Sequence, residues 1–303
     1  MPLHTDLMDD LVQPFQLESS HLRGRLVRLG PALDVILHQH AYAPMLAGLL
    51  GEAVVLAAAL ATSLKYDGVF TLQAKGDGQI KLLVADVTSD GGIRAYAQQA
   101  GEVAAETRNT KVLGNGYLMF TVSEASKDDR YQGIVELQGE TLAEGVQHYF
   151  RQSEQIPTGI LASVRQDDAG HWRGGCLMLQ RLPREGGLLP RAEVESDTSV
   201  EDDWRRAMLL MGSCTAAELT DPALSPYDLL YRLFHEEGVR VYDPHAFRHQ
   251  CRCSEERVTN MLRALPRAEM EELAENGVVT VTCEFCNRQY VFDEKRRGEL
   301  FRA

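Results

Sequence analysis

The feature that most constrains this fold is an apolar stretch in the first quarter of the chain. Glu52 is the one charged residue between positions 41 and 64. The uncharged piece after it, 53–64, is well short of the roughly 18 residues that a membrane-spanning helix needs. A helix over 44–64 is apolar almost all round, and such a helix is usually covered on more than one side. We therefore expect it inside a domain, with sheet on both sides or with sheet and helix.

Alternating apolar and polar residues predict strands around this helix. Gly-Asp-Gly at 76–78 and Asp-Gly-Gly at 90–92 are typical hairpin turns between such strands. Two further helices are predicted over 31–40 and 141–152. The predicted strands are 21–29, 68–75, 79–87, 93–97, 117–122, 132–138, 159–166 and 172–181. The fold class is therefore α+β, with an N-terminal domain of β-sheets packed around a buried apolar helix.

Composition limits the compartment and the partners. The 303 residues carry 31 basic and 44 acidic side chains, a net charge of −13, which argues against binding nucleic acid through its phosphates. Residues 1–6 contain no basic region and no apolar core, so we expect no signal peptide. We interpret the chain as a soluble, cytoplasmic protein. In that compartment, clustered cysteines indicate metal or redox chemistry more often than structural disulfides.

Charge and turn residues divide the chain into three predicted parts. Residues 1–181 form the α+β core domain. Residues 182–231 hold four basic and ten acidic side chains and open with a Pro- and Gly-rich run at 182–190, so we interpret them as an acidic, helical linker. Residues 232–303 carry 12 basic and 13 acidic side chains and contain the clustered cysteines. This last part is predicted to be a separate small domain.

Two apolar helical faces are predicted in the linker, and the second continues past residue 231 to Phe234. A plausible cap at Ser225 and Pro226 precedes the second of them. These faces are expected to pack on the first domain, but a segment with many acidic and few large apolar residues has little stability to spare. The packing is therefore predicted to be conditional. The two faces consist of Trp204, Met208, Leu209 and Met211, and of Leu229, Leu230, Leu233 and Phe234.

Four cysteines in two close pairs carry the strongest functional signal. Cys251 and Cys253 form the first pair, 29 residues precede the second, and Cys283 and Cys286 complete it. Two such pairs can supply a tetrahedral Cys₄ site, and zinc accepts four thiolates without a redox change of its own. The sequence therefore predicts one bound zinc ion. His245 and His249 are nearby alternatives to a thiolate, but four sulfur atoms already complete the site.

The interval between the pairs reads as a helical insert. Ser254 is placed to cap one helix and Pro266 to start another, and 278–282 with 289–292 should form a hairpin around the second pair. The same four thiols also allow a second state with two disulfides. Four cysteines have three possible pairings that sequence alone cannot choose between, although proximity favours Cys251–Cys253 and Cys283–Cys286. Oxidation would expel the metal and should unfold the small domain.

Several longer motifs resemble one known family. The run from Tyr149 to Thr158 (YFRQSEQIPT), the run from Tyr231 to Pro244 (YRLFHEEGVRVYDP) and the cysteine pairs that follow are similar to the redox-regulated 33-kDa heat-shock chaperones. Gly114 to Leu118 and Tyr131 to Val135 fit the same family. The resemblance covers nearly the whole chain and all three parts in order.

That resemblance implies a function. The family consists of ATP-independent holdases, which are not enzymes and need no nucleotide, and which bind unfolding client proteins and prevent their aggregation under oxidative stress. The reduced, zinc-bound form is inactive; oxidation forms the disulfides, releases zinc, unfolds the C-terminal domain and the linker and switches the protein on, often with dimerisation. On this resemblance the four cysteines are both zinc ligands and redox switch, and the eight linker side chains are candidate client contacts. Membrane and nucleic-acid partners are not expected.

Two other classes of function remain open. A thiol–disulfide oxidoreductase using Cys283 and Cys286 would normally place that motif in a βαβ context, which this region lacks. A zinc-ribbon adaptor or nucleic-acid module would need a basic, aromatic stripe, which 232–303 lacks. Cys176, within a predicted strand, and Cys214, near a helix end, are expected to be ordinary buried thiols.

Overall fold

The computed structural model describes residues 9–101, 110–124, 130–181 and 197–300. The chain forms two compact units, Met1–His249 and Gln250–Ala303. Residues 232–249, grouped with the cysteines by the sequence analysis, belong to the first unit. The predicted linker run at 182–190 lies outside the described residues.

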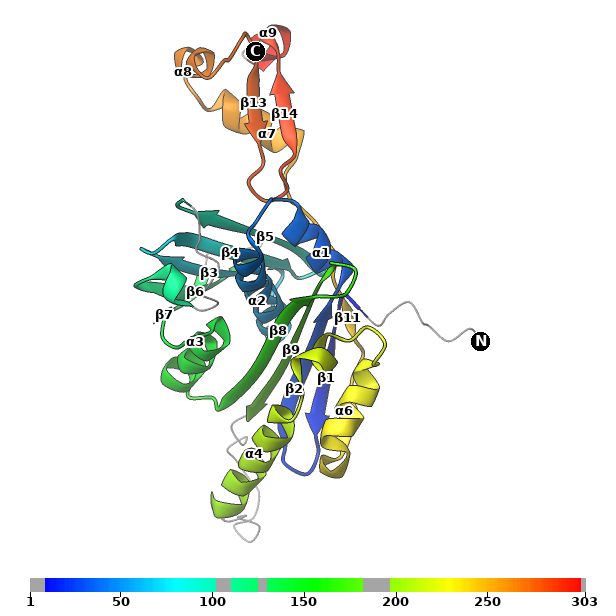
Figure 1. The fold of residues 1–303 in the computed structure, drawn as a ribbon. Coiled ribbons are helices and arrows are strands. Elements are labelled where there is room, and N and C mark those ends of the chain that lie inside the picture. The colour runs from blue at the N-terminus through cyan, green and yellow to red at the C-terminus, as the bar shows by residue number, and fades with distance from the viewer. Residues whose placement is uncertain (1–8, 102–109, 125–129, 182–196, 301–303) are drawn as a thin grey trace. The chain divides into compact units, whose positions relative to one another are not determined.

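The described residues of the first unit contain two six-stranded sheets (Figure 1). Sheet A has the order β10-β1-β2-β9-β8, with β11 also paired to β1, and sheet B has the order β12-β5-β4-β3-β6-β7. Neighbouring strands are antiparallel except β12 and β5, which are parallel. Sheet A comprises β1 (Leu11–Leu17), β2 (Leu22–Leu29), β8 (Thr158–Gln166), β9 (Trp172–Arg181), β10 (Val239–Val241) and β11 (His245–Ala246). Sheet B comprises β3 (Gly68–Gly76), β4 (Ile80–Thr88), β5 (Gly92–Gln99), β6 (Gly116–Glu124), β7 (Arg130–Glu136) and β12 (Arg248–His249).

The apolar helix lies between the two sheets, as its sequence predicted. This helix, α2 (Pro44–Ala61), contacts β2, β8 and β9 of sheet A and β3, β4 and β5 of sheet B (Figure 1). It is long and apolar enough to cross a membrane, but 83% of it is buried inside the protein, so its apolar surface is already covered. The remaining helices of this core are α1 (Pro31–His38) and α3 (Leu142–Tyr149), with short turns η1 (Thr110–Leu113) and η2 (Phe150–Glu154).

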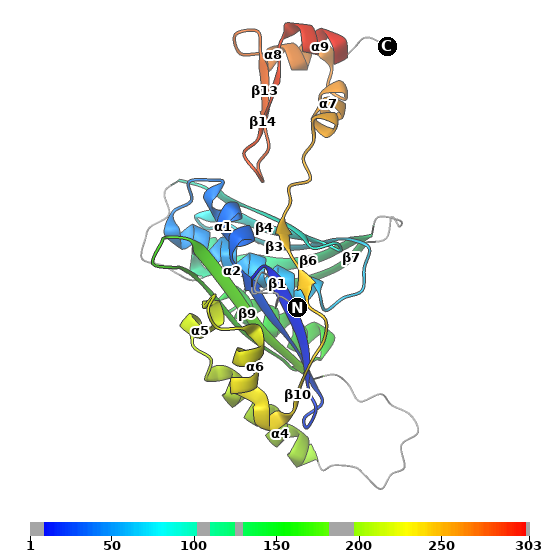
Figure 2. The ribbon, with the colours of Figure 1, turned by 90° about the vertical axis from the view of Figure 1, so that its right-hand side faces the viewer.

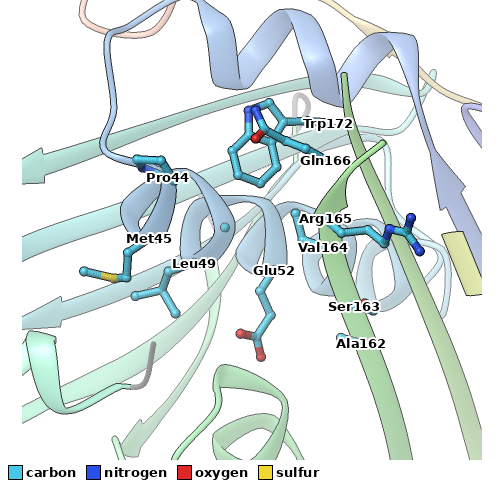
Figure 3. A pocket seen from close by; sticks show the side chains of 11 residues that line it. Pro44, Met45, Leu49, Glu52, Ala162, Ser163, Val164, Arg165, Gln166 and Trp172 are labelled. Carbon is cyan, nitrogen blue, oxygen red and sulfur yellow. The ribbon is translucent and has the colours of Figure 1, made fainter. Parts of the chain in front are cut away.

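The single charge in this helix caps a neighbouring helix. Glu52 Oε1 accepts a hydrogen bond of 3.0 Å from the Ala143 backbone N–H in the first turn of α3. Burial raises the pKa of Glu52, although the backbone N–H groups of Ala143 and Leu142 partly oppose that shift. Glu52 also lines a hollow of about 370 Å³ between the first turns of α2 and strand β8 (Figure 3). The break in the apolar run therefore has a structural role.

The linker helices cover the other face of sheet A (Figure 2). They are α4 (Asp197–Gly212), α5 (Ala216–Thr220) and α6 (Pro226–Phe234), followed by η3 (His235–Glu237). Ser225 caps α6, as predicted, by accepting from the Asp228 N–H at 3.0 Å. Gly159 lets α4 approach β8 closely, because a Cβ there would lie 2.3 Å from Met208 Sδ. Sheet A thus has one apolar core on each face.

The second unit is small. It contains α7 (Glu255–Arg263), α8 (Arg267–Glu272), α9 (Glu294–Leu300) and the hairpin β13 (Val279–Thr282) and β14 (Gln289–Phe292). Ser254 caps α7, and Pro266 directly precedes α8. These elements confirm the helical insert and the hairpin predicted between and around the cysteine pairs.

Candidate metal centre

Two different local structures present the four clustered thiols. Cys251 and Cys253 lie on an extended stretch that ends where Ser254 caps α7. Cys283 and Cys286 lie in the tight turn between β13 and β14. That turn is closed by the Cys283 N–H, which donates to the Arg288 carbonyl at 2.9 Å, and by the Asn287 N–H, which donates to the Cys283 carbonyl at 2.8 Å. The hairpin therefore fixes one pair and the helix cap positions the other.

The sulfur atoms have the spacing that a zinc ion requires. The Sγ atoms of all four cysteines lie within 4.8 Å of one another. The Sγ atoms of Cys251 and Cys283 are 3.7 Å apart, and those of Cys253 and Cys286 are 3.4 Å apart. A tetrahedron with Zn–S bonds of about 2.3 Å has S···S edges of about 3.8 Å. The thiols therefore fit a tetrahedral soft-metal site, and all six cysteines of the chain, each within the described residues, are unpaired.

The thiols differ in acidity. Burial raises the pKa of Cys251 and of Cys286. Burial also opposes ionisation of Cys253, but the Tyr290 hydroxyl and the neighbouring thiols outweigh it and lower the pKa of Cys253 to about 7. Because metal ligands must be thiolates, binding of a metal would release the protons that the other thiols hold.

Apart from the thiols, the described part of the second unit has only a small apolar core. Its buried apolar cluster has six members, with several partly buried side chains against them. Arg297 is buried and is paired with Glu271 and with the Gly277 carbonyl. Domains below about 70–80 residues rarely gain enough stability from such a core and usually need a metal or disulfides. The six members of the apolar cluster are Leu262, Met270, Val279, Tyr290, Phe292 and Leu300.

The predicted apolar faces of the linker are covered in this structure. Leu229, Leu230, Leu233 and Phe234 of α6 and Met211 of α4 are buried against sheet A, and Trp204 and Met208 pack at the edge of this cluster. Leu209 differs from its neighbours because 71% of it is exposed. Successive helical residues are about 100° apart, so position 209 turns away from the face shared by 204, 208 and 211.

Polar contacts that the sequence did not reveal also hold the linker. Arg28 of β2 is fully buried, and its guanidinium donates to the backbone carbonyls of Glu218, Asp221 and Leu224. Burial lowers the pKa of Arg28. In the sequence, the only indication of this contact was that a charged residue occupies a position of β2 that faces the protein interior. A buried guanidinium therefore fastens the loop between α5 and α6 to sheet A.

A second polar contact joins α4 to the end of the linker. Arg206 donates to both carboxylate oxygens of Glu237, one at 3.1 Å, and the Ser19 hydroxyl donates to the same carboxylate at 2.6 Å. The Arg206 guanidinium lowers the pKa of Glu237 against the opposing effect of burial, with help from Ser19. The carboxylate is therefore held in its charged form.

Comparison with known proteins identifies the family. The model of the family described as Hsp33 protein matches residues 10–293. The chain belongs to the Hsp33 family. A 33 kDa chaperonin of Caulobacter vibrioides is 39% identical over 300 residues, covering 95% of this chain and 96% of that protein. A 33 kDa chaperonin of Pseudomonas fluorescens is 35% identical, covering 98% and 95%. A chaperone role follows from this membership.

The fold agrees with a solved Hsp33 structure. A crystal structure of a 33 kDa chaperonin from Thermotoga maritima superposes with a TM-score of 0.80 and 24% identity, and it covers 96% of this chain and 97% of that one. The predicted α+β class and the resemblance to the 33-kDa heat-shock chaperones are confirmed.

The other predicted thiols and histidines belong to the first unit, whereas the four clustered thiols belong to the second. Cys176 in β9 and Cys214 after α4 are buried, as expected, and burial raises the pKa of both thiols. His245 and His249 belong to strands of the first unit, and His249 Nε2 lies 3.0 Å from Gln39 Nε2. The thiol cluster itself consists of the four predicted cysteines.

Proposed function

We propose that this Hsp33-family protein is a cytoplasmic, ATP-independent holdase that oxidation activates. The observation that carries the proposal is the set of four thiols within 4.8 Å of one another in a unit with a small apolar cluster. One zinc ion bound there would tie both cysteine pairs together as thiolates in the reduced, inactive form. Clients are unfolding polypeptides, and no nucleotide is needed.

The switching step is oxidation of each cysteine pair. The proposed products are the disulfides Cys251–Cys253 and Cys283–Cys286. Each bond joins two sulfur atoms, and the two electrons released break the O–O bond of one hydrogen peroxide molecule. Two protons, from the thiols or from solvent where the sulfur is a thiolate, complete two water molecules. The thiols of different pairs also lie close together, so the local pairing rests on proximity in sequence and on the family resemblance.

Loss of the thiolates would leave the second unit without its main restraint. Structural zinc contributes about 10–16 kcal/mol of apparent binding free energy in small domains. Net stabilities of whole domains are only about 5–15 kcal/mol. Unfolding of Gln250–Ala303 is therefore the expected result of oxidation.

The linker would supply the client-binding surface. Release of α4 and α6 from sheet A would uncover the seven covered candidate side chains, all but the already exposed Leu209, and the apolar face of sheet A beneath them. The acidic residues of the linker would keep a client complex in solution, and the uncovered faces offer a route to a homodimer. The proposal is supported by the polar contacts that hold the linker besides its apolar face: Arg28 binds α5 and the loop before α6, and Arg206 ties α4 to Glu237.

The first test is suppression of aggregation of a chemically denatured client without ATP. Zinc-loaded reduced protein should be inactive, and peroxide-treated protein should be active with about one zinc released per chain. The matched control replaces both other cysteines by alanine and should switch like the wild type. Zinc release without holdase activity would contradict the proposal, and catalytic turnover of a dithiol substrate would favour an oxidoreductase instead.

A further inference from the structure

One segment of the first unit is held across the edges of both sheets. Residues 239–249, here called the strap, contain β10, β11 and β12. The first two strands pair with β1 at the edge of sheet A, and the third pairs with β5 at the edge of sheet B (Figure 2). One extended segment therefore covers part of an edge in each sheet.

Main-chain hydrogen bonds attach the strap at several points along its length. The Tyr242 N–H donates to the Pro14 carbonyl at 3.0 Å, and the Phe247 N–H donates to the Asp10 carbonyl at 2.6 Å. The Arg248 N–H donates to the Gly91 carbonyl at 2.9 Å. The edges of β1 and of the turn before β5 thus bind the strap through its backbone, and exposed side-chain contacts of Arg240, Tyr242 and Arg248 add to these bonds.

The side chains of the strap point mostly into solvent. Val241 and Tyr242 are 40% and 46% exposed, and all positions from 240 to 246 are exposed. Phe247 is the fully buried exception: it is 6% exposed and belongs to the core between the two sheets. Val239 at the start of the strap is half-buried against the core beneath the linker. Binding of an extended chain through its backbone and one large buried apolar side chain makes few demands on sequence, so many different polypeptides could bind in this way.

The edge beneath the strap is apolar on both faces. Val12 of β1 lies in the core around α2, whereas Phe15 and Leu17 lie in the core beneath the linker. A strand of this kind with free backbone groups is a ready template for pairing with another extended chain. Removal of the strap would create such an edge.

We propose that the strap occupies the site at which an extended segment of a client binds. Such a client would add as a strand to β1 and β5 and place one large apolar side chain in the position of Phe247, the mode of recognition known as β-augmentation. This inference rests on the proposed holdase function and assigns it a second site besides the linker helices. Gln250 alone separates the strap from Cys251, so the strap is continuous with the redox centre in the chain.

The first test removes one backbone donor from the strap. R248P eliminates the N–H that bonds Gly91, whereas the matched control R248A keeps it and loses only the exposed contacts of Arg248 with Asp90. In reduced, zinc-loaded protein, R248P should bind a fluorescent extended apolar peptide about tenfold more tightly than the wild type, and R248A should not. Equal binding by R248P and wild type, with zinc retained, would overturn the inference.

The second test does not depend on a variant that folds. A synthetic peptide with the sequence 239–249 should compete with client for oxidised wild-type protein. The same peptide N-methylated at the amide of residue 248, or with serine in place of Phe247, should compete at least about tenfold less. Equal competition by all three, or none, would overturn the strap site while leaving the holdase function standing. Failure of the oxidised wild type to hold any client would instead remove the proposed function.

Discussion

The core around α2 and the cysteine-containing unit are stable for different reasons. Between the two sheets, dozens of apolar side chains from α1, α2, α3 and both sheets are buried together. In Gln250–Ala303, a hairpin and three short helices contribute only six buried apolar side chains, and the four thiols supply the further restraint that such a small core lacks. The first region depends on apolar burial and the second on the chemical state of sulfur.

That difference explains how one chain can be both robust and switchable. Apolar burial does not respond to an oxidant, so the core should survive the change. A thiolate site responds completely, because oxidised sulfur no longer binds the metal. The linker is intermediate in stability, because an apolar face and a few polar contacts hold it on sheet A.

The largest expected effect comes from removing half of the thiolate site. C283S/C286S should lose its zinc, and the second unit should unfold, because about 10–16 kcal/mol of metal binding is no longer available. Hydrogen exchange should report loss of protection in α7, β13 and β14, with α2 still protected. Tight binding of one zinc by this variant would show that the four-thiolate site is wrong.

A substitution in the core around α2 should destabilise the first unit and leave zinc binding unchanged. L50A removes a fully buried side chain of α2 and should lower the free energy of unfolding of the first unit by about 2–5 kcal/mol. Zinc content should not change. L209A, at the exposed linker position, is the matched control and should cost little. Loss of zinc in L50A would show that the two units do not have independent sources of stability.

The buried arginine tests the linker. R28M keeps an apolar stem but leaves the carbonyls of Glu218, Asp221 and Leu224 without their donor, at a cost of about 3 kcal/mol. Limited proteolysis should cut between α5 and α6 sooner than in wild type, with zinc retained. An unchanged cleavage rate would mean that apolar packing alone fastens the linker.

The smallest effect is expected from the contact between Arg206 and Glu237. The pKa of Glu237 is lowered in the folded protein from its ordinary value of 4.5, so this contact stabilises above that value, and the stabilisation is lost as the pH falls through the lowered pKa. Wild type should therefore show more protection in α4 than E237Q at pH 7. That difference should vanish at acidic pH; a difference that persists there would contradict the ionic origin.

Local patterns predicted a large part of the molecule. The eight predicted strands, the buried helix and the caps at Ser225 and Ser254 all occur, because they depend on periodicity and turn chemistry within a few residues. Strand β1 was missed, since Pro14 interrupts its pattern and such a residue argues against a strand interior. The short strands of the strap were missed because two- and three-residue strands carry no period.

By itself the sequence determined the buried helix, the α+β class and the four candidate metal ligands. Each depends on a residue's own chemistry or on its near neighbours, as a thiol pair or an apolar run does. Only the tertiary structure decided that Arg28 fastens the linker, that Leu209 faces solvent and that residues 239–246 pair with β1. The contact of Arg28 and the pairing with β1 join positions about two hundred residues apart. The exposure of Leu209 depends on how α4 is rotated about its axis. Backbone hydrogen bonds between distant strands do not depend on the order of the side chains, so the sequence pattern does not reveal them.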